Sequence, residues 1–230
     1  MELCVALDLP SKKENLELLE KIKEHNNLWI KVGFRSYIRD GKEFLEDIKK
    51  INSSFKIFLD LKLYDIPNTM ADAALEIANL GVDMFNVHAS SGVKAMQTVM
   101  DRLNSLNKRP IVLAVTALTS FDNEAFREVY NKDLDKTAIK FAKDAYNSGL
   151  DGVVSSVYES KEIKNATNSN FLTLTPGIRP FGEDSNDQKR VATIDVAKDN
   201  LVDFIVVGRP IYKNSNPAQK VSEIVAELNK

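Results

Sequence analysis

Residues 55–63, FKIFLDLKL, have the composition of a β-strand and raise the question that decides the fold. The leucines of this run alternate with Asp60 and Lys62, so a strand would carry the leucines on one face and both charges on the other. Charges on one face of a strand are ordinarily solvated. Whether Asp60 and Lys62 are solvated depends on the sheet to which the strand belongs.

Short apolar runs of this kind recur along the whole chain, separated by stretches with helical character. Three such stretches are 68–80, 92–103 and 216–230, the last with Pro217 suited to the first turn of a helix. Eight strands alternating with about eight helices predict a parallel α/β sheet, and this number favours a single (β/α)₈ TIM barrel spanning 1–230. An open sheet of eight strands is the competing architecture. The eight expected strands are 3–9, 28–34, 55–63, 84–89, 111–118, 152–157, 171–177 and 203–209.

Composition narrows the class of protein. The chain has 230 residues, 43% of them hydrophobic, with a net charge of -2, which suits one large globular domain and argues against a nucleic-acid or membrane-surface binder. The single cysteine, Cys4, lies in an apolar run and cannot form an internal disulfide, and no Cys/His cluster indicates a metal site. Neither a leader segment nor an apolar run of about 20 residues is apparent, so we expect a cytoplasmic protein without a membrane partner.

The longest irregular regions expected are 119–133 and 178–191. Each follows a predicted strand, so each is expected at the C-terminal face of the barrel, where this architecture carries its sites.

Polar residues gather where the predicted strands end. In a barrel these ends meet at one mouth, so Asp8, Lys31, Asp60 and Lys62 would become neighbours. A single charge at a strand end often marks only the point where the chain reaches water. Two anions and two cations on three adjacent strands, however, predict an alternating network in which each charge offsets the desolvation of the next.

The end of the last predicted strand indicates a phosphate site. Gly208 permits close backbone approach, and Arg209 offers bidentate contacts to phosphate oxygens. The preceding loop adds Arg179 and Gln188. A surface arginine in a turn is the alternative, but loops after the seventh and eighth strands are a recurrent phosphate site in such barrels.

Residues 60–69, DLKLYDIPNT, resemble the D-x-K-x-x-D-I-P-N-T signature of the orotidine 5′-phosphate decarboxylase family. The D-x-K-x-x-D core is also similar to that of related sugar-phosphate decarboxylases and aldolases, and the continuation IPNT narrows the match. The resemblance extends over essentially the whole chain. Its other segments are VALD at 5–8, IKVG at 30–33, LTS at 118–120, TPGIR at 175–179 and VGR at 207–209.

The resemblance implies catalytic roles for the charged residues at the mouth. Lys62 would donate a proton to carbon 6 of the pyrimidine as carbon dioxide leaves, and Asp60 would lie beside the departing carboxylate. Lys31, helped by Asp8, would link Asp60 to the ribose hydroxyls, and Thr119 would hydrogen-bond the pyrimidine.

The resemblance also implies a homodimer with shared active sites, because Asp65, Ile66 and Thr69 would reach into the site of the partner subunit. Gln188, Gly208 and Arg209 would hold the phosphate, and the loop 180–190 would close over it. Pro176 and Arg179 would lie at the root of that loop, with Arg179 also facing the phosphate.

The expected activity is decarboxylation of orotidine 5′-monophosphate to UMP, the last step of de novo pyrimidine synthesis, without cofactor or metal. The alternatives are a related sugar-phosphate decarboxylase or aldolase of the same fold, and a non-catalytic nucleotide-binding barrel. His88 is expected to be structural, packed or hydrogen-bonded within the fold.

Overall fold

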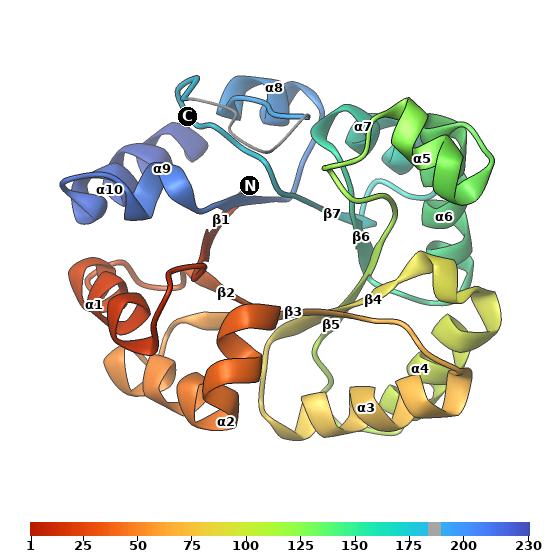
Figure 1. The fold of residues 1–230 in the computed structure, drawn as a ribbon, viewed down its shortest axis with the longest axis horizontal. Helices are drawn as coiled ribbons and strands as arrows, with labels where there is room; N and C mark the ends of the chain where they lie inside the picture. The colour runs from red at the N-terminus through yellow and green to blue at the C-terminus, as the bar shows by residue number, and fades with distance from the viewer. Residues whose placement is uncertain (184–189) are drawn as a thin grey trace.

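A computed structural model describes residues 1–183 and 190–230 of the chain. Eight parallel strands pair in sequence order and close into a barrel through the contact of β1 with β8 (Figure 1). The predicted TIM barrel is therefore confirmed, and the open sheet is excluded. The strands are β1 Glu2–Ala6, β2 Trp29–Gly33, β3 Lys56–Leu63, β4 Met84–His88, β5 Ile111–Val115, β6 Gly152–Val154, β7 Leu172–Thr175 and β8 Phe204–Val207.

The helices form an outer ring around the strands (Figure 1). The three stretches expected to be helical correspond to α3, α4 and α10, and prolines occupy the first turns of α3 and α10. The described helices are α1 Lys12–Ile22, α2 Phe34–Ile51, α3 Pro67–Asn79, the 3₁₀ turn η1 Ala89–Ser91, α4 Val93–Leu103, α5 Asn123–Tyr130, α6 Leu134–Asn147, α7 Val157–Ala166, α8 Ile194–Asp199, α9 Arg209–Tyr212 and α10 Pro217–Leu228.

The expectation that 119–133 is irregular was wrong, because the region contains α5. The Asp122 side chain caps this helix by accepting a hydrogen bond from the Ala125 N–H at 2.9 Å. Phe126 is the residue of α5 that is buried, so the helix lacks the broad apolar stripe that marks a helix in sequence.

Two apolar layers hold the barrel together. The larger lies between the sheet and the helices, and a second cluster, drawn from all eight strands, fills the barrel interior. Trp29 and Phe204 make an edge-to-face contact within this inner cluster, with ring centroids 5.4 Å apart. A filled interior leaves the C-terminal mouth as the place for a ligand. The inner cluster comprises Cys4, Ala6, Trp29, Phe58, Met84, Leu113, Val115, Val154, Leu174, Phe204 and Val206.

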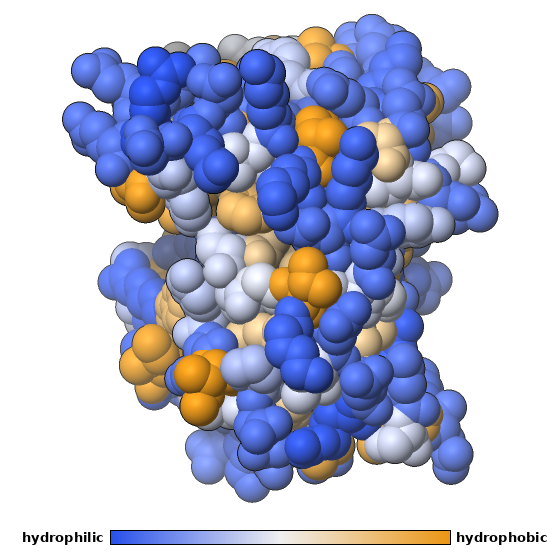
Figure 2. Space-filling view, turned by 90° about the vertical axis from the view of Figure 1, so that its right-hand side faces the viewer, coloured by the Kyte–Doolittle hydropathy of each residue, from blue (hydrophilic) through white to orange (hydrophobic). Residues whose placement is uncertain are grey.

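The outer surface is different in character. Figure 2 shows the side that carries α4 and α6, where hydrophobic residues are scattered singly among hydrophilic ones. Among the described residues, no helix combines the length and the apolar character needed to cross a bilayer.

An aspartate directly before each of β4, β6 and β8 fastens the base of the barrel. Each carboxylate accepts a hydrogen bond from a backbone N–H near the start of the preceding strand, so one side chain joins two strands. Each carboxylate also pairs with a cation, whose buried or half-buried charge it neutralises. The backbone pairs, each at 2.8 Å, are Asp83 with Ile57, Asp151 with Val112 and Asp203 with Thr173. The cations are Lys49, Arg109 and Lys164 respectively.

Replacing Asp203 by asparagine should lower the free energy of unfolding by about 2 kcal/mol, because the side chain of Lys164 is only 7% exposed and would lose its counter-ion at 2.8 Å. Urea unfolding measures the change, and Asp101→Asn at an exposed site on α4 is the control. Turnover per folded molecule should be unchanged, since the base is the end of the barrel opposite the mouth. Equal stability of the two variants would contradict this role.

Candidate active site

A cavity of about 310 Å³ opens at the C-terminal mouth of the barrel. Its walls come from the ends of strands that are up to two hundred residues apart in the chain, as the barrel topology requires. Ser120 and Tyr212 also line it, although sequence reasoning had not singled them out. The predicted site residues that line the cavity are Asp8, Lys31, Asp60, Lys62, Thr119, Pro176, Arg179, Gly208 and Arg209.

Four charged side chains form a continuous chain along one wall of this cavity. Lys31 Nζ lies 3.2 Å from Asp8 Oδ1 and 3.6 Å from Asp60 Oδ2. Lys62 Nζ donates to Asp60 Oδ1 at 2.5 Å. Anion and cation therefore alternate from Asp8 to Lys62, across β1, β2 and β3.

Burial makes this alternation necessary. Burial alone would raise the pKa of Asp60, but the charges of Lys31 and Lys62 outweigh it and hold that pKa below the ordinary aspartate value. Burial likewise opposes the charge of Lys31, yet Asp60 and Asp8 together hold the pKa of that ammonium above its ordinary value. Lys31 and Asp60 are thus both ionised at neutral pH.

Glycine at the end of β2 makes room for the chain of charges. A side chain at Gly33 would begin 3.2 Å from Lys31 Nζ and 3.6 Å from Asp8 Oδ1. The next residue, Phe34, places its ring centroid 5.7 Å from Lys62 Nζ, where the ring face attracts the cation. Phe34 was not identified from the sequence, because an aromatic residue at a strand end has no distinctive pattern.

Strand β3 is irregular at the Asp60–Lys62 pair. Its register with β4 shifts between Leu59 and Leu63, and the backbone of Lys62 is left-handed, with φ of 47°. A non-glycine residue pays about 1–2 kcal/mol for that conformation. The Lys62 N–H donates to the side-chain oxygen of Asn86 on β4 at 2.7 Å. The regular alternation expected for 55–63 therefore ends at Lys62, although the charges of Asp60 and Lys62 still meet.

Two arginines line the part of the cavity formed by the ends of β7 and β8, and β8 is the barrel neighbour of β1. Gly208 and Arg209 begin α9 directly after β8, and Arg179 follows β7 with its side chain buried. The Arg179 N–H donates to Ala192 O at 2.8 Å, which fixes the start of the loop after β7. The predicted residue Gln188 lies outside the described residues.

Three predicted residues lie apart from the cavity of this chain. Asp65, Ile66 and Thr69 are exposed beyond the end of β3, and Asp65 Oδ1 accepts from the neighbouring Ile66 N–H at 2.6 Å. They do not line the cavity. One chain therefore brings together the residues expected for its own site and leaves on the surface those expected to serve a partner.

His88, at the end of β4, makes structural contacts with Tyr64 and Ser90. Its ring stacks on Tyr64 with centroids 5.7 Å apart, and its Nδ1 accepts from the Ser90 N–H at 3.2 Å. Burial, and then the charge of Lys62, lower the pKa of His88. A neutral ring that accepts at Nδ1 carries its proton on Nε2.

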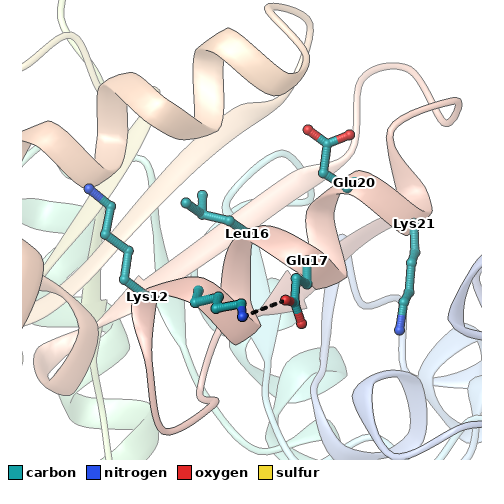
Figure 3. Close-up of a pocket in the computed structure, with 6 residues that line it drawn as sticks. Lys12, Leu16, Glu17, Glu20 and Lys21 are labelled. Atoms are coloured by element: carbon teal, nitrogen blue, oxygen red, sulfur yellow. Dashed lines mark ion pairs between the residues drawn. The ribbon is translucent and has the colours of Figure 1, made fainter.

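A second, larger hollow of about 710 Å³ lies along α1, but it lacks the features of a site. All of its lining residues belong to this one helix, and Figure 3 shows their side chains diverging from the helix rather than converging. The Lys13–Glu17 pair there, at 3.8 Å, is highly exposed. Such pairs contribute little and are typical of a solvated helix face.

Metal-ligating and thiol chemistry have no candidates in the part of the chain that the structure describes. No group of three or more His, Cys, Asp or Glu side chains there is arranged to hold a metal ion. Cys4 is fully buried in the barrel interior, and burial raises the pKa of its thiol, so the reactive thiolate is disfavoured.

Comparison with known proteins identifies relatives of this chain in both sequence and fold. Residues 1–224 match the model of the orotidine 5′-phosphate decarboxylase / HUMPS family. The chain is 67% identical over 228 residues to the orotidine 5′-phosphate decarboxylase of Sulfurimonas denitrificans, covering 99% of this chain and 100% of the relative. The crystal structure of the Lactobacillus acidophilus orotidine 5′-phosphate decarboxylase superposes with a TM-score of 0.86 at 33% identity, covering 100% of this chain and 99% of that one.

A second solved structure carries a ligand. The orotidine 5′-monophosphate decarboxylase of Methanocaldococcus jannaschii, described as complexed with the inhibitor BMP, superposes with a TM-score of 0.79 at 27% identity. It covers 100% of this chain, and this chain covers 99% of it.

The lowered pKa of Asp60 predicts that Asp60→Asn reduces the free energy of unfolding by an amount that depends on pH. The Asp60 charge stabilises the fold fully above about pH 4, the ordinary value in an unfolded chain, and this contribution is lost as pH falls through the lower folded pKa. The free energy of unfolding of the variant should therefore be about 2–3 kcal/mol lower than that of the wild type at pH 7, and this difference should shrink toward pH 3.

Urea unfolding of the wild type, Asp60→Asn and the exposed control Asp101→Asn between pH 3 and 7 measures this dependence. A deficit for Asp60→Asn that stays constant or grows as the pH falls would show that the Asp60 charge is not stabilised by its neighbours.

Proposed function

The chain belongs to the orotidine 5′-phosphate decarboxylase / HUMPS family, and we propose that it decarboxylates orotidine 5′-monophosphate to UMP with Lys62 as the proton donor. It is an enzyme of pyrimidine biosynthesis, as its close relatives are. The observation that supports the proposal most strongly is the Asp60–Lys62 pair, held at 2.5 Å in a cavity that two arginines also line.

The reaction needs a cation at one carbon atom. When the bond from carbon 6 to the carboxylate breaks, carbon dioxide leaves and an electron pair remains in the plane of the ring, with no conjugated group to accept it. The Lys62 ammonium stabilises this charge and then transfers its proton to carbon 6, which completes UMP. The neutral amine regains a proton from solvent. Asp60 orients the ammonium and lies beside the departing carboxylate.

The remaining cavity residues would bind the parts of the substrate other than carbon 6 and its carboxylate. Arg209, the Gly208 N–H and Arg179 would bind the phosphate, and Lys31 with Asp8 would bind the ribose hydroxyls. Thr119 and Pro176 would contact the substrate between these ends. Contacts remote from carbon 6 supply binding energy that aligns the reacting atoms. No step of this scheme calls for a metal or an organic cofactor.

We also propose a homodimer in which each chain completes the site of the other. The support is the exposure of the segment after β3, where Asp65 lies between Tyr64 and Ile66, whose exposed fractions are 65% and 67%. Phe34 and Ile38, on α2, are exposed as well, at 50% and 78%. Large apolar side chains exposed near a mouth are typical of an interface. The proposal also includes a single catalytic domain and a cytoplasmic location.

Replacing Lys62 by alanine should reduce turnover of orotidine 5′-monophosphate by at least about 10⁴-fold, since both the charge at carbon 6 and the proton donor are lost. Binding of UMP should change by only a few-fold, because the phosphate and ribose contacts remain. The decrease in orotidylate absorbance measures turnover, and calorimetry measures binding. The exposed lysine variant Lys13→Ala is the control. Turnover like that of the wild type in Lys62→Ala would refute the proton-donor role.

The same absorbance assay separates this activity from the alternatives. Turnover that persists after chelator treatment and desalting is expected. Loss of turnover with chelator would favour a metal-dependent sugar-phosphate enzyme of the same fold, and UMP binding without any release of carbon dioxide would favour a non-catalytic barrel.

A shared site predicts complementation between two inactive variants. Lys62→Ala and Asp65→Ala chains, mixed and allowed to exchange, should recover about a quarter of the wild-type activity, because half of the dimers are hybrids and each hybrid has one intact site. Mass spectrometry of the intact dimers verifies the exchange. Absence of recovery with hybrids present would show that Asp65 acts within its own chain.

A further inference from the structure

Asn86 is a polar side chain in the barrel interior that the proposed reaction does not yet use. It is 1% exposed and lies on β4, two residues beyond Met84, which belongs to the apolar interior cluster. A buried amide is costly unless its groups are hydrogen-bonded. Its position among apolar neighbours therefore calls for a specific reason.

Both ends of the amide are used, and both contact the catalytic pair. Asn86 Oδ1 accepts the Lys62 backbone N–H at 2.7 Å, and Asn86 Nδ2 donates to Asp60 Oδ1 at 2.8 Å. The orientation of the amide is fixed by chemistry, because a backbone N–H can only donate and an ionised carboxylate can only accept.

The first contact replaces a missing strand pairing. Leu59 pairs with Phe85 and Leu63 with Val87, so three residues of β3 stand opposite the single residue Asn86 on β4. Such a bulge leaves backbone groups without ladder partners. The Asn86 side-chain oxygen supplies the partner for the Lys62 N–H, at the residue whose backbone is left-handed.

The second contact orients the carboxylate. Asp60 Oδ1 receives both Lys62 Nζ at 2.5 Å and Asn86 Nδ2 at 2.8 Å. Asp60 is thereby held at one oxygen by two donors, while its other oxygen faces Lys31 at 3.6 Å. One amide thus fixes the backbone of the proposed proton donor and the side chain of its counter-ion.

We propose that Asn86 is a positioning residue for the decarboxylation, keeping the Lys62 ammonium and the Asp60 carboxylate in their reactive arrangement. The inference rests on the proposed function. It assigns to Asn86 an effect on turnover rather than on substrate binding, because Asn86 does not line the cavity.

The sharpest test is the pH profile of Asn86→Asp. At pH 8 the new carboxylate would face Asp60 and could not donate, so kcat should fall by about 10²-fold. Burial beside a like charge raises the pKa of a carboxyl group, so the new group gains its proton as pH falls. When protonated it again offers one donor and one acceptor in the shape of the amide. The ratio of variant to wild-type kcat should therefore rise from pH 8 to pH 5.

Asn86→Leu supplies the pH-independent comparison. It has a similar volume and neither polar group, so its kcat should also fall by about 10²-fold, with a flat ratio to the wild type and UMP affinity within a few-fold. Amide exchange should show the Lys62 N–H losing protection in this variant. The matched control is Thr173→Val, which removes a buried side-chain hydrogen bond to Ser160 and a partly buried one to Asp203, at the base of the barrel. Its kcat should equal that of the wild type.

The outcomes separate this inference from the function on which it rests. A wild type that releases no carbon dioxide from orotidylate would overturn both. An active wild type with a flat pH ratio in Asn86→Asp, or an Asn86→Leu kcat within about threefold of the wild type, would overturn the positioning role alone. Amide exchange that is unchanged at Lys62 in Asn86→Leu would also overturn it.

Discussion

The rest of the site depends on the contacts of the Asp60 carboxylate with Lys31, Lys62 and Asn86. The carboxylate is buried in the barrel, where a lone charge would be expelled or protonated, and it stays ionised because two ammoniums and one amide surround it. The same arrangement keeps Lys31 charged and directs Lys62 into the cavity. The buried charges of Asp60 and Lys31 are each stabilised by their neighbours, so the catalytic group that we propose is the network and not one residue.

The contacts that stabilise the barrel lie at its base and in its interior, apart from the charged network at the mouth. The base of the barrel is fastened by Asp83, Asp151 and Asp203, and the interior below the mouth is apolar. With that foundation, β3 can hold a register shift and a left-handed Lys62 at its end, a local cost of about 1–2 kcal/mol. Strain of this kind is concentrated at functional sites, where the surrounding structure holds it in place.

Much of this arrangement follows from sequence, because β-strand periodicity and the convergence of strand ends are local and topological rules. The eight strands, the barrel and the meeting of Asp8, Lys31, Asp60 and Lys62 could all be predicted in this way. Helix α5 was missed because one buried residue, Phe126, makes no stripe. Asn86 was missed because its partners lie on another strand at a shifted register, and Phe34 because its contact with Lys62 joins the start of α2 to the end of β3. Contacts created by an irregularity leave no periodic signal.

The central claim is that the Lys62 ammonium delivers the proton to carbon 6, and the reverse step tests it most directly. If it is correct, the neutral amine must also remove that hydrogen from bound UMP, so UMP incubated with the enzyme in heavy water should gain deuterium at carbon 6. Proton NMR would follow the loss of the carbon 6 signal. The account predicts exchange with the wild type and none above background with Lys62→Ala. Undiminished exchange in Lys62→Ala would contradict it, because another group would then be the acid.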